Sequence, residues 1–241
     1  MAENIKTAAI VLAAGSGSRM HSDIKKQYME INKRPLIYYA LKAFEDSFTD
    51  EIVLVVSPGD IDYCKTEIVD KYGFTKVKRI VEGGKERYDS VRLGLHGVSK
   101  DADYVMIHDG ARPFVTEDIM RRSIDAAIEH RACVVGMPVK DTIKISDSDG
   151  FAADTPDRKL LWMVQTPQTF DYKLILSLYD QLELRKEEIK EKGISITDDA
   201  MVVETFSDIK VKLVEGSYNN IKITTPEDIG FAEAILGKCE V

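Results

Sequence analysis

Short apolar runs alternate along this chain with longer segments that carry helix signals. The runs at 8–12, 51–56 and 132–135 have the length and composition of strands buried on both faces. Strands that alternate with helices predict a parallel sheet with right-handed crossovers. The expected strands are 8–12, 51–56, 77–81, 104–107, 132–135 and 209–214, and the expected helices are 35–44, 60–72, 86–98, 116–130, 172–192, one after Thr197 and one from Pro226.

The rhythm changes between residues 138 and 165. Polar and apolar residues alternate over 142–146, a turn of Asp and Ser with Gly150 follows, and further short extended pieces run to Val164. This pattern predicts a β-hairpin that projects from the sheet as an arm. Because an isolated hairpin is marginal in water, we expect a homodimer held through this arm. No linker is apparent, so residues 1–241 are expected to form one α/β domain.

The composition of the chain limits the classes of molecule that it is expected to bind. A formal net charge of −8 argues against a nucleic-acid or anionic-membrane surface, although a small polyanionic substrate suits locally gathered Lys and Arg. The apolar runs are too short to span a bilayer, and the N-terminus has no signal-peptide pattern, so a cytoplasmic location is expected. The cysteines and histidines lack zinc-ligand spacing.

A stretch of almost bare backbone, Ala13-Ala-Gly-Ser-Gly-Ser18, follows the first apolar run. Gly15 and Gly17 allow positive φ and a close approach of backbone N–H groups to an anion. Arg19 and Lys26 add positive charge seven residues apart. We interpret the stretch as a cradle for a triphosphate, with an ordinary strand-to-helix turn as the alternative.

Two known glycine motifs do not fit this stretch. It lacks the Gly-Lys-Ser/Thr of the P-loop, and Met20 stands where a dinucleotide fingerprint needs its third glycine. A nicotinamide-dependent dehydrogenase is therefore disfavoured.

Besides the stretch 15–26, three further clusters, 83–90, 108–112 and 138–142, lie at or near the ends of expected strands, where ligands of α/β sheets bind. Gly83, Gly84 and Ser90 could read the edge of a pyrimidine base, or they could form a plain turn before a helix. Asp109 could help hold Mg²⁺. Arg112 could fork onto a phosphate, or it could pair with Asp109 in a turn.

With these residues in place, the chain resembles the 2-C-methyl-D-erythritol 4-phosphate cytidylyltransferase family over nearly its whole length. The matching pieces are 12–20, Lys26-Gln27, 83–84 through 89–90, 108–114, Asp141-Thr142, 166–168, 196–198, 220–222 and 226–228. The resemblance implies a Rossmann-like, three-layer nucleotidyltransferase fold with a mostly parallel sheet and a projecting β-arm at about 138–165. It implies that CTP and methylerythritol phosphate react, with a divalent ion such as Mg²⁺, to give the CDP-alcohol and pyrophosphate.

The resemblance also implies a set of roles. Arg19, Lys26 and Lys222 would be catalytic, by stabilising the charged α-phosphate. Nucleotide binding would fall to Ala13, Ala14, Gly15, Gly17, Gly83, Gly84, Ser90, Asp109 and Gly110, with Asp109 also on the metal side. The substrate would meet Arg158, Thr142, Arg112 and Thr197, the arm residues reaching across the dimer. On its own, Thr197-Asp-Asp199 is typical of a helix N-cap.

The chain departs from the family pattern at two places. Lys25 stands where the family commonly has Pro, and Gly110 stands where it commonly has Ala. We assign the phosphate-facing role to Lys26 because it keeps the spacing from Arg19. A ribitol-5-phosphate cytidylyltransferase and a non-catalytic, CTP-binding regulatory dimer remain as alternatives.

Overall fold

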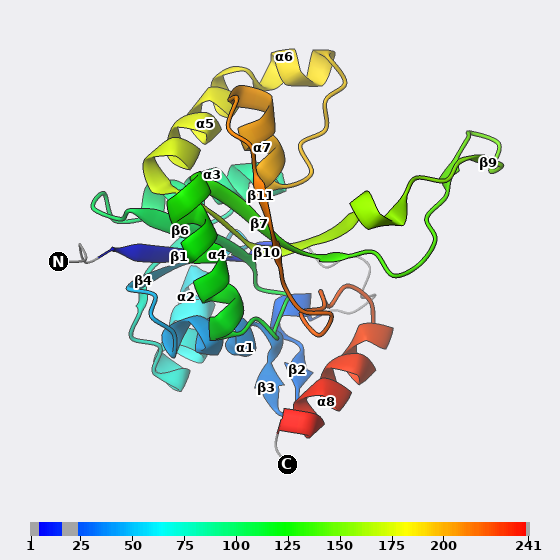
Figure 1. The fold of residues 1–241 in the computed structure, drawn as a ribbon. Coiled ribbons are helices and arrows are strands. Elements are labelled where there is room, and N and C mark those ends of the chain that lie inside the picture. The colour runs from blue at the N-terminus through cyan, green and yellow to red at the C-terminus, as the bar shows by residue number, and fades with distance from the viewer. Residues whose placement is uncertain (1–4, 16–23, 240–241) are drawn as a thin grey trace.

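The computed structural model describes residues 5–15 and 24–239. Its centre is a seven-stranded sheet with the order β11-β7-β10-β6-β1-β4-β5 (Figure 1). The strands are β1 (Thr7–Ala13), β4 (Glu51–Val56), β5 (Val77–Glu82), β6 (Tyr104–Asp109), β7 (Ala132–Pro138), β10 (Trp162–Asp171) and β11 (Lys212–Glu215). Strand β10 is antiparallel to both of its neighbours, and the other pairings in this sheet are parallel. The mostly parallel sheet predicted from the sequence is confirmed.

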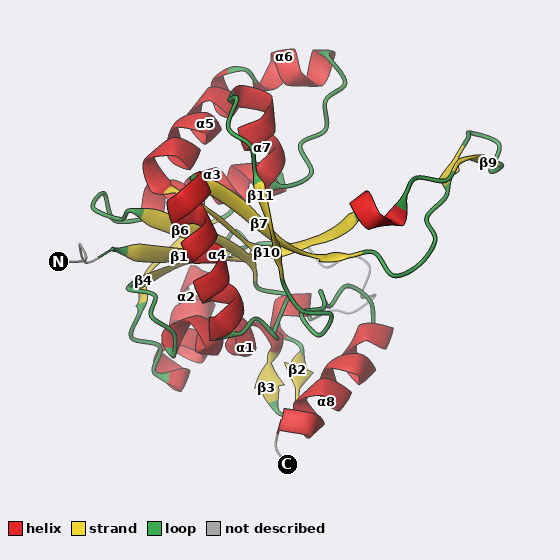
Figure 2. Cartoon of the chain, in the orientation of Figure 1, coloured by secondary structure: helices red, strands yellow, loops and turns green. Residues whose placement is uncertain are grey.

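Helices cover both faces of the sheet and make three layers (Figure 2). Along β1, Ala8 and Ile10 belong to one core cluster while Ala9 and Val11 belong to the other, as the alternation of a strand requires. The first layer holds α3 (Arg87–Gly97), α5 (Tyr172–Leu184) and α7 (Asp199–Phe206). The second holds α1 (Leu36–Glu45), the π-helical η3 (Cys64–Asp70) after the short α2 (Ile61–Tyr63), and α4 (Glu117–His130).

Strand β10 was not predicted beyond Val164, although it lies in the middle of the sheet. The sequence there is polar, and Thr166, Gln168 and Thr169 are all buried. Their polar groups are satisfied within the fold: Thr169 Oγ1 donates to Ser123 Oγ at 3.0 Å, and Gln168 Oε1 accepts from the Ala200 amide at 2.8 Å. Buried polar residues that find partners give no apolar strand signal, which explains the omission.

The other differences are local. The helix expected over 172–192 is divided at Arg185 into α5 and α6 (Lys186–Glu191), and the strand expected over 209–214 runs over 212–215. A small hairpin, β2 (Glu30–Ile31) with β3 (Arg34–Pro35), was not predicted. It packs with the C-terminal helix α8 (Glu227–Cys239) in a separate apolar cluster around Ile31, Leu36 and Ile223.

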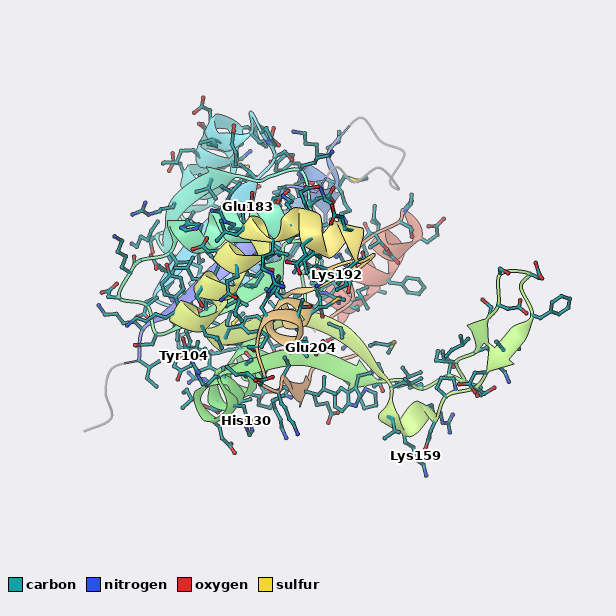
Figure 3. All side chains as sticks on the ribbon, turned by 90° about the horizontal axis from the view of Figure 1, so that it is seen from above. Tyr104, His130, Lys159, Glu183, Lys192 and Glu204 are labelled. Carbon is teal, nitrogen blue, oxygen red and sulfur yellow. The ribbon has the colours of Figure 1, made fainter. Side chains whose placement is uncertain are left out.

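The arm leaves the sheet between β7 and β10 and extends away from the body of the protein (Figures 1 and 3). It contains β8 (Ile145–Ser146), β9 (Ala152–Asp154) and the 3-10 turn η4 (Arg158–Leu160); Figure 3 shows Lys159 on the arm between the body and the hairpin at its tip. The projecting β-arm is therefore confirmed. Within 5–15 and 24–239, no helix is long and apolar enough to cross a bilayer.

Candidate active site

A cavity of about 450 Å³ opens where β1, β5 and β6 end, at the carboxyl edge of the sheet. This is the edge at which parallel α/β sheets bind ligands. Eight of the predicted site residues line it: Ala13, Ala14, Gly15, Lys26, Gly84, Ser90, Asp109 and Lys222. The structure thus brings three of the four predicted clusters to this cavity, whereas no residue of the fourth, 138–142, lines it.

The carboxylate of Asp109 is the centre of a group of charged side chains in this cavity. Its side chain is 11% exposed, and its carboxylate faces three cations. Lys222 Nζ lies 2.8 Å from Oδ2, Arg87 Nε lies 3.6 Å from Oδ1, and Arg112 Nε lies 3.7 Å from Oδ2. Burial alone would raise the pKa of Asp109, but Arg87 and Lys222 outweigh it and hold that pKa below its usual range. The carboxylate is therefore ionised at neutral pH.

The backbone of Asp109 is held by a buried network. The Asp109 amide donates to Thr166 Oγ1 at 3.0 Å, and Thr166 Oγ1 lies 3.0 Å from His108 Nδ1. His108 Nε2 lies 3.0 Å from the Arg112 carbonyl, which can only accept. Nε2 therefore carries the proton, and the Thr166 hydroxyl donates to Nδ1. Burial lowers the pKa of His108 to about 4, so this neutral tautomer persists.

The two neighbouring lysines after the glycine stretch have different environments. Lys25 Nζ lies 2.7 Å from both carboxylate oxygens of Asp60, and the Tyr28 hydroxyl donates to the same carboxylate at 2.9 Å. Gln27 Nε2 donates to the Ala13 carbonyl at 2.7 Å. The 3-10 turn η2 (Lys26–Tyr28) is therefore fastened on two sides, and Lys26 is the lysine that lines the cavity. This agrees with the assignment made from spacing.

The turn after β5 is shaped by Ser90. Its hydroxyl accepts from the Gly84 amide at 3.1 Å and donates to the Glu86 carbonyl at 3.2 Å. Helix α3 begins directly after, with a capping box between Glu86 and Asp89. A Cβ on Gly83 would lie only 2.4 Å from Ala14 Cβ, so the ends of β1 and β5 meet at this glycine.

Among the described residues, four more of the predicted site residues do not line the cavity. Thr142 and Arg158 lie exposed on the arm, where Arg158 Nη1 donates to the Lys140 carbonyl at 3.0 Å. Thr197 is exposed before the N-cap of α7, which is Asp198. Gly110 is buried against Ile37. Gly17 and Arg19 lie outside the described residues.

The ion pair between Arg112 and Asp109 that the sequence offered as one interpretation is present, with Nε 3.7 Å from Oδ2. Arg112 Nη1 donates to the Asn220 carbonyl at 2.8 Å and its Nη2 to the Val164 carbonyl at 3.3 Å. Nε, buried, has no hydrogen-bond partner among the described residues. Arg112 therefore ties the loop after β11 to the base of the arm, and its predicted contact with substrate stays a prediction.

Sequence analysis did not single out Arg87 or Asp199. Arg87 lines the cavity and forms a two-pronged ion pair with the fully buried Asp199, with both N–O distances 2.7 Å. The only signal was that Arg87 falls inside the stretch 83–90 and that Asp199 follows an N-cap motif; their pairing spans 112 residues.

The fold and this cavity define an α/β nucleotide-binding protein whose site gathers lysines and arginines around one carboxylate, as phosphoryl and nucleotidyl transfer requires. The family model of 2-C-methyl-D-erythritol 4-phosphate cytidylyltransferase matches residues 7–238. The chain belongs to this family.

Proteins of that name are similar over nearly the full length. The one from Lachnoclostridium phytofermentans is 50% identical over 231 residues, which is 96% of each chain. The one from Alkaliphilus oremlandii is 50% identical over 236 residues, or 97% of each chain. The crystal structure of 4-diphosphocytidyl-2C-methyl-D-erythritol synthase from Anaerococcus prevotii superposes with a TM-score of 0.83 at 36% identity, covering 97% of this chain and 96% of that one. The resemblance inferred from the motifs is confirmed, and the comparisons favour it over the ribitol-5-phosphate family.

Proposed function

We propose that this protein transfers the cytidylyl group of CTP to 2-C-methyl-D-erythritol 4-phosphate, giving 4-diphosphocytidyl-2-C-methyl-D-erythritol and pyrophosphate. The observation that carries the proposal is the cavity at the sheet edge, where Lys222 and Arg87 face the ionised carboxylate of Asp109 and Lys26 lines the same cavity beside a glycine-rich strand end. Family membership supplies the identity of the two substrates.

The reaction needs positioning and charge more than covalent help. A phosphate oxygen of the second substrate attacks the α-phosphorus of CTP, and the bond between the α- and β-phosphates breaks as pyrophosphate leaves. Lys26 and Lys222 would stabilise the charge that develops on the α-phosphate, together with Arg19 as predicted from the sequence. The side chain of Lys222 is 39% exposed, and among the described residues its ion pair is with Asp109, so it can exchange that carboxylate for a phosphate.

The geometry of Ser90 suits cytosine. Its only proton is used on the Glu86 carbonyl, so toward a ligand it can only accept a hydrogen bond. The exocyclic amine of cytosine is a donor at the position where uracil has an acceptor. We therefore expect Ser90 to favour CTP over UTP.

A magnesium ion fits this site as a partner of the nucleotide. Among the described residues no group of three or more potential ligand side chains gathers, and Asp109 is the carboxylate at the strand end. Mg²⁺ is commonly held by one or two carboxylates together with substrate phosphates. Asp109 would hold it on that basis, and the ion would neutralise charge on the triphosphate. The rest of the catalytic charge comes from the lysines.

We propose a homodimer formed through the arm. The arm carries exposed apolar side chains, with Phe151 72% and Leu160 79% exposed, and few contacts with its own body. A second copy of the chain would cover them and bring Thr142 and Arg158 to the partner's cavity. Mixing the inactive variants Lys26→Ala and Arg158→Ala should then restore activity, because a hybrid dimer holds one intact site; no recovery after subunit exchange would contradict the shared site. The cytoplasmic location stays a prediction.

The test of the proposed reaction is pyrophosphate release with CTP and Mg²⁺, with methylerythritol phosphate and ribitol 5-phosphate offered separately. We expect turnover of methylerythritol phosphate. Turnover of ribitol 5-phosphate alone would move the protein to the other cytidylyltransferase class, and binding of CTP without turnover of either would indicate the regulatory dimer.

A further inference from the structure

A buried polar cluster outside the catalytic residues lies directly behind Asp109. Asp199, the first residue of α7, is fully buried and accepts three hydrogen bonds. Arg87 Nη1 and Nη2 donate to its two oxygens at 2.7 Å each, and the buried Tyr179 hydroxyl donates to Oδ1 at 2.5 Å. A buried carboxylate in this position is costly to desolvate and contributes little to stability compared with apolar packing. We therefore look for the role of Asp199 in the position and orientation that it gives to Arg87.

That geometry concerns the guanidinium of Arg87. A two-pronged pair with a carboxylate fixes the guanidinium plane as well as its position. With one N–H of each Nη atom donated to Asp199, the Nε side of the guanidinium faces Asp109, and Nε lies 3.6 Å from Oδ1. Three elements of the first helical layer, α3, α5 and α7, thus aim one cation at the site carboxylate.

The N-terminus of α7 is itself fastened to the sheet. Gln168 on β10 accepts from the Ala200 amide at 2.8 Å, and its Nε2 donates to Asp198 at 3.1 Å. Because Asp199 begins the helix between these two contacts, its carboxylate cannot follow a movement of Arg87. Asp199 therefore holds Arg87 from a helix end that is itself fixed to the sheet.

We propose that Asp199 and Tyr179 are positioning residues, which hold Arg87 against Asp109 so that Lys222 can leave Asp109 for the substrate phosphate. If Lys222 departed before a metal ion arrived with the nucleotide, and Arg87 did not face Oδ1, Arg112 at 3.7 Å would be the one cation left beside the buried carboxylate among the described residues. An unpaired buried charge is strongly unfavourable. Asp109 would then retain Lys222, and the reaction would lose a cation at the α-phosphate. The inference rests on the proposed cytidylyl transfer.

The test compares Asp199→Asn with Asp180→Asn. Asp180 lies on α5 next to Tyr179 and also accepts from an arginine of α3, Arg92 at 3.1 Å, but its side chain is 42% exposed and outside the cavity. We expect Asp199→Asn to lower kcat by about tenfold with KM for CTP changed much less, because the loss concerns the transition state. Asp180→Asn should match the wild type.

A double-mutant cycle separates positioning from damage to the fold. In a Lys222→Ala background there is no lysine to release, so Asp199→Asn should lower the residual rate by less than about twofold. Tyr179→Phe, which removes one hydrogen bond and keeps the ring, should give a smaller loss of kcat that also disappears in that background. Equal losses with and without Lys222, or a kcat for Asp199→Asn equal to that of Asp180→Asn, would overturn the inference. An inactive wild-type protein would instead refute the proposed reaction, so the two failures are distinct.

Discussion

Replacing Gly83 by Ala tests whether the close meeting of β1 and β5 builds the nucleotide site. The added Cβ would lie 2.4 Å from Ala14 Cβ and 2.7 Å from Ser90 Oγ. Carbon atoms pack at about 3.5–4.0 Å, so the strand ends must separate by about 1 Å. The contact with Ala14 Cβ cannot be relieved by a rotamer change, because that atom is fixed to the backbone, and turning Ser90 Oγ away would break its hydrogen bonds with Gly84 and Glu86. Overpacking of this kind costs about 1–3 kcal/mol of the free energy of unfolding.

For a chain of this size, a loss of about 2 kcal/mol lowers Tm by roughly 4–8 °C. The matched control is Gly15→Ala, because a Cβ there meets no atom of the described residues within 4 Å and Gly15 does not have positive φ. We expect Gly15→Ala to unfold in urea within about 0.5 kcal/mol of the wild type. Calorimetry should show weaker CTP binding by Gly83→Ala, since Ala14 and Ser90 both line the cavity. A Gly83→Ala protein with wild-type stability and CTP affinity would refute the reasoning.

Two further predictions concern stability. Gly110→Ala should lower the free energy of unfolding by about 1–3 kcal/mol, because the added Cβ would lie 2.4 Å from Ile37 Cδ1 and 2.9 Å from the Leu12 carbonyl oxygen. Adding Ile37→Val should recover part of this loss in urea titrations. No recovery would show that Ile37 is not the obstacle. Burial raises the pKa of the Cys133 thiol from its usual 9.0 to about 12. The neutral thiol therefore contributes its full share to the free energy of unfolding below pH 9, and this contribution is lost as the pH rises toward 12. Between about pH 8 and pH 10.5 the wild type should lose about 2 kcal/mol more than Cys133→Ala, and parallel pH profiles would contradict this.

The parallel sheet and most of the cavity could be predicted from the sequence, because both depend on local signals. Apolar runs mark the buried strands, and the cavity residues stand directly after those runs, so their convergence follows from the topology. Long-range pairing of polar residues has no such signal. Strand β10 was missed beyond Val164 because the partners of Gln168 and Thr169 come from other parts of the chain. The pair of Arg87 with Asp199 was missed for the same reason.

The two lysines show where the sequence and the structure support each other. In the sequence, Lys26 was preferred over Lys25 because of its spacing from Arg19. In the structure, Lys25 stands at the start of the turn η2 and pairs with Asp60, whereas Lys26 lines the cavity. The roles of Thr142 and Arg158 depend on a second copy of the chain, so the fold of one chain does not test them.

The central claim is that the cavity cations stabilise the transition state of cytidylyl transfer. Its most direct test is the single-turnover rate of CDP-alcohol formation from labelled CTP and methylerythritol phosphate, with Lys26→Ala compared with Lys25→Ala. The account predicts that Lys26→Ala lowers this rate by roughly 10²- to 10³-fold, with the Kd for CTP changed by less than about tenfold, because the charge it opposes develops during the reaction. Lys25→Ala should stay within about threefold of the wild type, because Lys25 pairs with Asp60 and does not line the cavity. Equal rates for Lys26→Ala and the wild type, or a larger loss for Lys25→Ala, would contradict the claim.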